Sequence, residues 1–153
     1  MARKSPLAPA RFPHLAPIAG VRLAAGTFGL RYKGRADLML AELAPGTTIA
    51  GVLTRSATAA APVDWCRQAL KRGRARLIVV NAGNANAFTG KAGIAAVERT
   101  AARGARLFDC PANQVFVSST GVIGEPLDDG KIRRAMATLK RRLAPGMSSP
   151  TAG

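Results

Sequence analysis

The segment that most constrains the fold is a run of apolar residues in the middle of the chain. Leu77 to Val80 are apolar without interruption, and Ile78, Val79 and Val80 are β-branched. A short run of this kind is typical of a strand covered on both faces, so we expect a buried strand over residues 76–81. The amide-rich stretch 81–86 follows at once and predicts a turn. Any fold for this chain must therefore contain a strand that ends in a polar loop.

Apolar residues at helical spacing predict three helices after residue 60. Pro62 suits the first turn of a helix over 61–70, and Gly73 lies where its C-cap belongs. Asp128 or Asp129 can cap the last helix. The predicted apolar faces of the second and third helices are Ile94, Val97, Ala101, Ala105 and Phe108 within 91–108, and Ile132, Met136, Leu139 and Leu143 within 131–143.

Glycine-flanked and β-branched segments predict the remaining strands. We expect two short strands within 20–34, a hairpin formed by 37–43 and 47–53, and a strand over 114–118 that ends in a loop over 119–124. Strands come first and then alternate with helices. This order predicts an α+β layered domain rather than a doubly wound parallel sheet.

The length and composition are those of one globular domain. The chain has 153 residues, of which 48% are hydrophobic and 20% are charged. No apolar stretch approaches the roughly 20 residues that a membrane span needs, and no signal-peptide core follows the N-terminal basic residues, so we expect a cytoplasmic protein without membrane contact. The predicted organisation is an irregular arm over 1–19, a domain over 20–143 and a disordered tail over 144–153.

The net charge of +15 raises the possibility of nucleic-acid binding. The basic residues are dispersed, however, and aromatic residues make up only 5%, so we expect no specific nucleic-acid partner. A non-catalytic basic binding protein stays as an alternative, and the missing acidic charge can also lie on another piece of a larger protein. Cys66, Cys110 and His14 have no metal-ligand spacing, so we expect buried free thiols, no metal and no cofactor.

Two loops have side chains suited to chemistry. Within 118–126, Thr120 places a hydroxyl beside the backbone N–H of Gly121, and such a pair can hold the oxyanion of an acyl transfer. The other interpretation is a glycine-rich turn whose hydroxyls bond their own backbone. Asn81 and Asn84 are weaker candidates for substrate contact, and the alternative for them is local bonding within a turn.

Six stretches of the sequence, in order, resemble the ornithine acetyltransferases, also called bifunctional glutamate N-acetyltransferases. They are Ala19 to Ala24, Arg31 to Asp37, Gly46 to Ser56, Ala61 to Arg67, Asn81 to Gly90, and Ser119 to Leu127. The resemblance runs from about Pro6 to about Leu143. It covers most of this chain but only the N-terminal part of such an enzyme.

This resemblance implies part of an αββα sandwich, an α2β2 assembly and no cofactor. In the family the precursor cuts itself at an Ala-Thr bond, and the new N-terminal threonine of the β chain is the nucleophile. It takes acetyl from N-acetylornithine, or from acetyl-CoA in bifunctional members, and passes it to glutamate. By resemblance, Thr120 and Gly121 form the oxyanion hole on the α chain.

The family's later substrate-binding and cleavage stretches are not found in this sequence. Ala57-Thr58 and Ala137-Thr138 are Ala-Thr pairs, but neither has the family's flanking residues. We therefore expect a fragment that holds the oxyanion hole without a nucleophile or the β chain, is inactive alone, and aggregates when isolated. A fragment of a same-fold aminopeptidase is a further alternative. The sequence does not separate bifunctional from ornithine-only activity.

Overall fold

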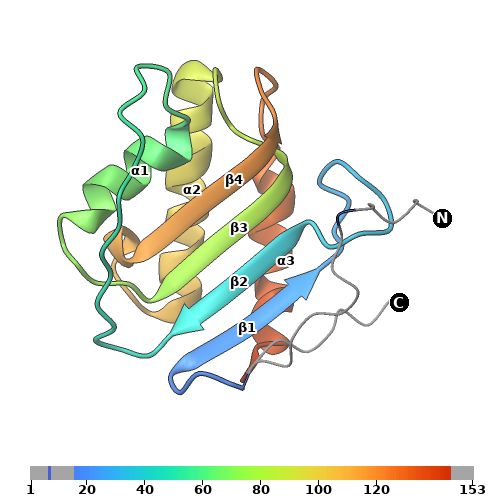
Figure 1. Ribbon diagram of the computed structural model, residues 1–153. Coiled ribbons are helices and arrows are strands. Elements are labelled where there is room, and N and C mark those ends of the chain that lie inside the picture. The colour runs from blue at the N-terminus through green and yellow to red at the C-terminus, as the bar shows by residue number, and fades with distance from the viewer. Residues whose placement is uncertain (1–6, 8–15, 146–153) are drawn as a thin grey trace.

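The computed structural model describes residue 7 and residues 16–145, and these form an α+β fold built on one mixed sheet (Figure 1). The predicted fold class is confirmed. The sheet has five strands in the order β4-β3-β2-β1-β5. The elements, in chain order, are β1 (Val21–Gly26), β2 (Leu38–Leu43), α1 (Ala61–Leu70), β3 (Leu77–Asn84), α2 (Gly90–Phe108), the short 3-10 helix η1 (Ala112–Gln114), β4 (Val115–Val122), α3 (Asp129–Arg141) and β5 (Ala144–Pro145).

One pair of strands is parallel and the others are antiparallel. β1 and β2 form an antiparallel pair with Val21 opposite Leu43, and β2 pairs antiparallel with β3. β3 and β4 run parallel from Leu77 opposite Val115, and α2 makes the crossover between them. β3 therefore lies between β2 and β4, with backbone partners on both edges.

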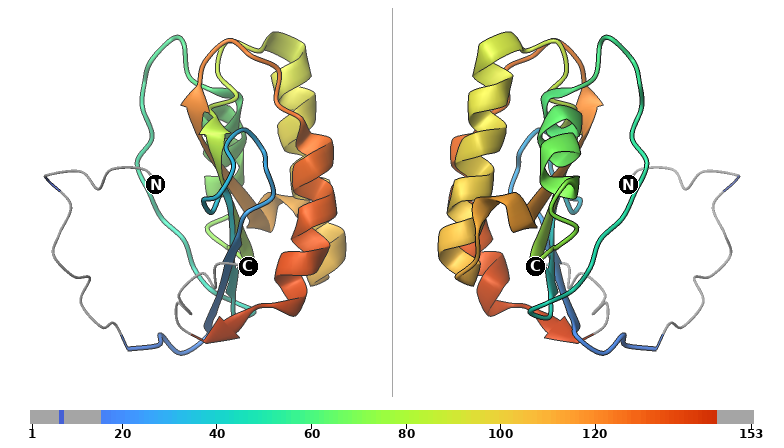
Figure 2. Two further views of the ribbon diagram at one scale, coloured as in Figure 1. Left: turned by 90° about the vertical axis from the view of Figure 1, so that its right-hand side faces the viewer. Right: turned by 90° about the vertical axis from the view of Figure 1, so that its left-hand side faces the viewer.

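Helices α2 and α3 cover one face of this sheet (Figures 1 and 2). α2 can approach closely because it has Gly104 at the contact, where a Cβ would lie only 2.8 Å from Leu77 Cδ2 and 3.0 Å from Val115 Cγ1. The core between the two layers contains Leu38, Leu40, Leu77, Val79, Val115, Ala101, Phe108, Ile132, Met136 and Leu139, all at most 4% exposed. The predicted faces of both helices are confirmed except for Ile94, which is 51% exposed.

Helix α1 lies beside the β4 edge of the sheet (Figure 1). Trp65 Nε1 donates to the carbonyl oxygen of Val115 at 2.8 Å, and the Cys66 thiol donates to that of Val117 at 3.3 Å. Phe116, on the other face of β4, packs in a small cluster with residues of and after α1. The bounds predicted for this helix are confirmed, although the C-cap is Lys71 rather than Gly73.

The second face of the sheet is less covered. Along β3, buried residues alternate with half-buried ones, and Ile78 and Val80 are among the half-buried set. Met39 of β2 is half-buried on the same face. The expectation that the β3 segment would be covered on both faces is therefore only half met by the described residues.

Two predicted strands are wrong. Residues 47–53 form only an isolated bridge, Thr48 to Arg74, and Val52 is 98% exposed, because no neighbouring strand is placed to pair with this β-branched segment. Residues 27–37 form a loop after β1 rather than a second strand. The buried carboxylate of Asp37 accepts the N–H groups of Phe28 at 2.8 Å and Leu30 at 2.7 Å, which fixes the loop.

Three smaller differences concern the chain ends and the cysteines. Ala144 and Pro145 form β5, with Ala144 opposite Leu23, whereas the sequence places both in a disordered tail. The other residues of that predicted tail, 146–153, and most of the predicted arm lie outside the described residues. Cys66 and Cys110 are free but half-buried, not fully buried. Burial raises the pKa of both thiols.

Candidate functional site

The predicted oxyanion loop is the end of a strand. β4 continues through Val122 instead of ending at residue 118, because β3 also continues and pairs with it as far as Asn84. In this register Thr120 lies opposite Ala82, and Gly121 lies opposite Gly83. The local conformation of Thr120 and Gly121 is therefore set by a neighbouring strand, which holds a backbone site more firmly than a free loop would.

Gly121 occupies a position where no side chain fits. Its φ is +132°, and a Cβ there would lie 2.3 Å from the carbonyl carbon of Gly83 and 2.5 Å from the backbone nitrogen of Asn84. Gly83 also has a positive φ, +111°, and a Cβ on it would lie 2.8 Å from Arg31 Cβ. The two glycines let two backbones and the 27–37 loop meet at one point.

Thr120 is exposed beside this contact. Because side chains alternate along a strand, Thr120 lies on the face of β4 that carries Phe116, opposite to α2 and α3. No hydrogen bond involves its hydroxyl within residues 16–145. The hydroxyl is thus free to donate to a ligand at the less covered face of the sheet.

Asn81 lies opposite Ser119, the residue before Thr120, and is only 1% exposed. Its Oδ1 accepts a 2.6 Å hydrogen bond from the hydroxyl of Ser119, and its Nδ2 donates to the carbonyl of Asn84 at 2.9 Å. This buried amide therefore joins the end of β3 to the residue that precedes Thr120. Its polar atoms are occupied inside the protein, an arrangement suited to positioning the site.

Asn84 and Asn86 connect the two loops that follow the strands. Asn84 Nδ2 donates to the carbonyl oxygens of Glu125 at 3.0 Å and Pro126 at 3.3 Å, while its Oδ1 accepts the N–H of Asn86 at 2.7 Å. Asn86 is fully buried, with a φ of 48°, and its Nδ2 bonds the Gly93 carbonyl in α2 at 2.9 Å. The two loops and the start of α2 are therefore one connected unit.

A third segment, the basic 27–37 loop, borders the same site. Arg31 makes an ion pair with Glu125, which comes shortly after Thr120 and Gly121 in the sequence. The guanidinium of Arg35 stacks 3.7 Å from the centre of the Tyr32 ring. Sequence reasoning missed Arg31, Glu125 and Ser119. The rare acidic Glu125, in a chain with 8 acidic and 23 basic residues, is the one signal that could have pointed to this pair.

Other kinds of site find little support in the described part of the chain. Among residues 7 and 16–145, no group of histidine, cysteine or carboxylate side chains is arranged to hold a metal ion. His14 lies outside this part. No described helix is both long and apolar enough to cross a membrane.

Curated relatives are identical to this chain at about half of the aligned positions. A protein of Bradyrhizobium diazoefficiens named arginine biosynthesis bifunctional protein ArgJ is 50% identical over 142 residues, covering 93% of this chain and 34% of the relative. A protein of the same name from Nitrobacter winogradskyi is 54% identical, over 92% of this chain and 35% of the relative. The chain thus spans about a third of the length of these relatives.

Solved structures agree with these relatives. The ornithine acetyltransferase of Mycobacterium tuberculosis, solved in complex with ornithine, is 40% identical and superposes with a TM-score of 0.79, over 86% of this chain and 70% of that chain. The protein argJ of Bacillus halodurans is 32% identical with a TM-score of 0.74, over 77% of this chain and 62% of that one. The family model described as the ArgJ family matches residues 22–152. This chain belongs to the ArgJ family.

Proposed function

We propose that this chain supplies the oxyanion-binding part of a cytoplasmic acetyltransferase of arginine biosynthesis. The observation that carries the proposal is the pair Thr120 and Gly121, a free hydroxyl beside a residue that only glycine can occupy, fixed at the end of a paired strand. The names of the relatives and the family membership support the same activity.

In this proposal an attacking hydroxyl adds to the acetyl carbonyl, and negative charge develops on the carbonyl oxygen. The Thr120 hydroxyl and the Gly121 N–H donate to that oxygen. Donors that are already aimed at this position act without reorganisation, and each can be worth about a hundredfold to a thousandfold in rate. The Asn81 to Ser119 hydrogen bond holds the strand that carries both donors.

The remaining parts of the reaction belong to the rest of the proposed enzyme. By the family resemblance, an N-terminal threonine of a β chain is the nucleophile, and its own amine acts as the base. It takes acetyl from N-acetylornithine or acetyl-CoA and transfers it to glutamate, with no cofactor. The half-buried face of the sheet, with Val80 and Met39, is where a second layer of an αββα sandwich would pack in an α2β2 assembly.

A chimera tests whether these residues support catalysis. Residues 22–143 of this chain would replace the matching segment of the Gluconobacter oxydans relative, which is 54% identical over 145 residues. The measurement is acetyl transfer from N-acetylornithine to glutamate. Thr120→Ala should lower kcat about a hundredfold to a thousandfold with little change in KM, because the lost donor acts in the transition state.

Thr58→Ala is the matched control, since Thr58 is exposed and, among residues 16–145, its side chain bonds only to Ser56. Equal rates for the two variants would refute the role of Thr120. A folded, self-cleaved chimera without acetyl transfer would refute the proposed activity of this segment. Peptide hydrolysis in place of acetyl transfer would instead support the aminopeptidase alternative.

A further inference from the structure

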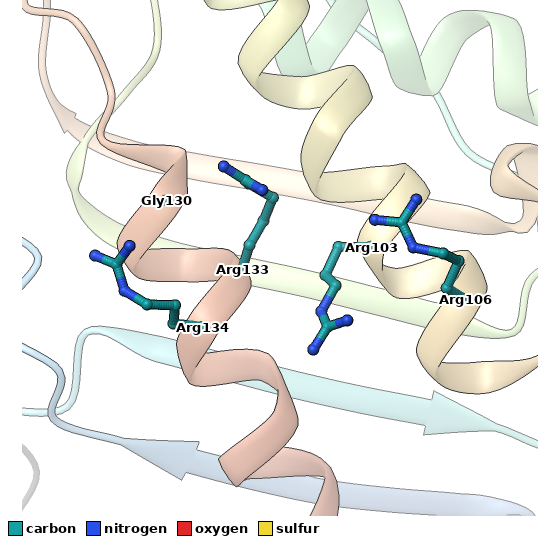
Figure 3. A pocket seen from close by; sticks show the side chains of 5 residues that line it. All are labelled: Arg103, Arg106, Gly130, Arg133 and Arg134. Atoms are coloured by element: carbon teal, nitrogen blue, oxygen red, sulfur yellow. The ribbon is translucent and has the colours of Figure 1, made fainter.

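A hollow lined by arginines lies on the helix layer. It has a volume of about 210 Å³ and is lined by Arg103 and Arg106 from α2 and by Gly130, Arg133 and Arg134 from α3. Figure 3 shows Arg103 and Arg133 in the groove between the two helices, Arg106 further along α2, and Arg134 leaving α3 on the side away from α2. We name this the arginine hollow.

The positive charge of the arginine hollow is poorly neutralised. Arg133 bonds Asp129 at 2.7 Å, but the same carboxylate is shared with Arg99, also at 2.7 Å. Arg103, Arg106 and Arg134 have no ion pair or hydrogen bond within residues 16–145. Asp128 caps α3 by accepting the N–H of Lys131 at 3.2 Å, and no ion pair is formed between Asp109, at the end of α2, and Arg106 within residues 16–145. Like charges gathered without counter-ions raise the local potential and favour an anion.

Gly130 leaves bare backbone between two of these guanidinium groups. A Cβ at this position would lie 3.4 Å from a terminal nitrogen of Arg134 and 3.9 Å from one of Arg133, with Asp128 Oδ1 at 3.0 Å. Arg133 is oriented by Asp129, which is only 6% exposed. Arg103 and Arg133 therefore lie in the groove between the helices, and Arg133 is held in place in advance.

We propose that the arginine hollow binds a diphosphate group. Planar guanidinium groups donate pairs of hydrogen bonds to phosphate oxygens, and arginines spread along a groove between two helices suit an anion with two adjacent phosphates better than a single carboxylate. Nucleotides and coenzyme A both carry such a group. The hollow has no aromatic lining residue to stack a nucleic-acid base, so a polymer would meet only charges here. The inference does not depend on the proposed acetyl transfer.

Calorimetric titration of the folded chain with inorganic pyrophosphate tests the proposal at about 0.15 M salt, where diffuse attraction is screened. The double variant Arg103→Glu/Arg106→Glu should weaken pyrophosphate binding at least about tenfold, because charge-assisted hydrogen bonds to phosphate are lost and replaced by repulsion. The matched control is Arg55→Glu/Arg72→Glu, which changes the net charge equally at exposed positions outside the hollow.

A conservative variant separates recognition from charge. Arg103→Lys/Arg106→Lys keeps the net charge but removes the forked donors, and it should also weaken pyrophosphate binding relative to the unchanged chain. Titrations with ADP and with coenzyme A then identify the source of the diphosphate. Equal weakening by the control pair, equal affinity for orthophosphate, or tighter binding of single-stranded RNA than of any diphosphate would overturn the proposal.

Discussion

The two faces of the sheet differ in how completely they are packed. The face under α2 and α3 has side chains such as Leu40, Leu77 and Val115 with no exposed surface at all. The opposite face presents Met39, Ile78 and Val80, which are equally apolar but only half-buried. Sequence alone gives both faces the same apolar character. The difference between them teaches that one half of the core is complete within this chain and the other half has apolar surface still to bury.

The largest difference in unfolding free energy should come from substitutions at two neighbouring residues of β2 that point to opposite faces. Leu40→Ala removes a fully buried side chain and should lower the free energy of unfolding by about 2–5 kcal/mol. Met39→Ala, on the half-buried face, should cost less than about 1 kcal/mol. Denaturant unfolding of both variants measures the difference, and similar losses would show that the two faces are packed alike.

A smaller loss of stability is expected from a substitution where α2 packs on the covered face of the sheet. Gly104→Ala adds a methyl group close to Leu77 and Val115, and overpacking of this kind costs about 1–3 kcal/mol, partly offset by the better helix propensity of alanine. Leu77→Val removes the nearest atoms, so the double variant should lose less stability than the sum of the single ones. A double-mutant cycle measures this coupling. Strict additivity would contradict the close approach of α2.

The helix layer should also respond to pH through Asp129. Burial alone would raise the pKa of this carboxyl, but the hydrogen bonds and charges of Arg99 and Arg133 outweigh burial and hold the pKa below its usual range. Its contribution is therefore fully present above the unfolded pKa, about 4, and is lost as the pH falls below that value. Asp129→Asn should cost about 1 kcal/mol at neutral pH, since both arginines are largely solvated.

Unfolding curves at neutral and acidic pH test this prediction. The unchanged chain and the Asp129→Asn variant should approach the same stability near the acidic end. A gap between them that is independent of pH would mean that Asp129 acts through packing rather than through its charge.

The smallest expected effect tests what covers the half-buried face. Val80→Thr keeps the shape of the side chain, and in the isolated chain it should change the unfolding free energy by less than about 0.5 kcal/mol. In the chimera with the longer relative, a hydroxyl buried without a partner should cost about 1–3 kcal/mol. Equal costs in the two proteins would indicate that this face stays open.

The sequence predicts the elements whose partners are close along the chain. Helix α1 has the predicted bounds, and α2 begins one residue early, at Gly90. Periodicity and caps are local signals, and they suffice here. The segment 47–53 misleads because a β-branched sequence forms a strand only beside a partner, and the structure places none there.

The candidate site is harder to predict for the same reason. Thr120 and Gly121 stand out in the sequence, but the pairing that fixes them depends on Gly83, which a local pattern assigns to a turn. Asn81 can be identified as a polar residue after a strand. Its bond to Ser119 joins residues 38 positions apart, and no spacing rule contains that contact. Distant pairing, rather than composition, is what sequence reasoning could not supply.

The hydrogen bonds from α1 to the edge strand β4 restrict the pairing of this strand with other proteins. An edge strand with unpaired carbonyl oxygens is a template on which a foreign strand can grow, the route to fibres and to strand exchange. Here Trp65 and Cys66 occupy the carbonyl oxygens of Val115 and Val117. Strand addition along that stretch of β4 would require α1 to detach first, so stacking against the apolar face is the less obstructed route to assembly.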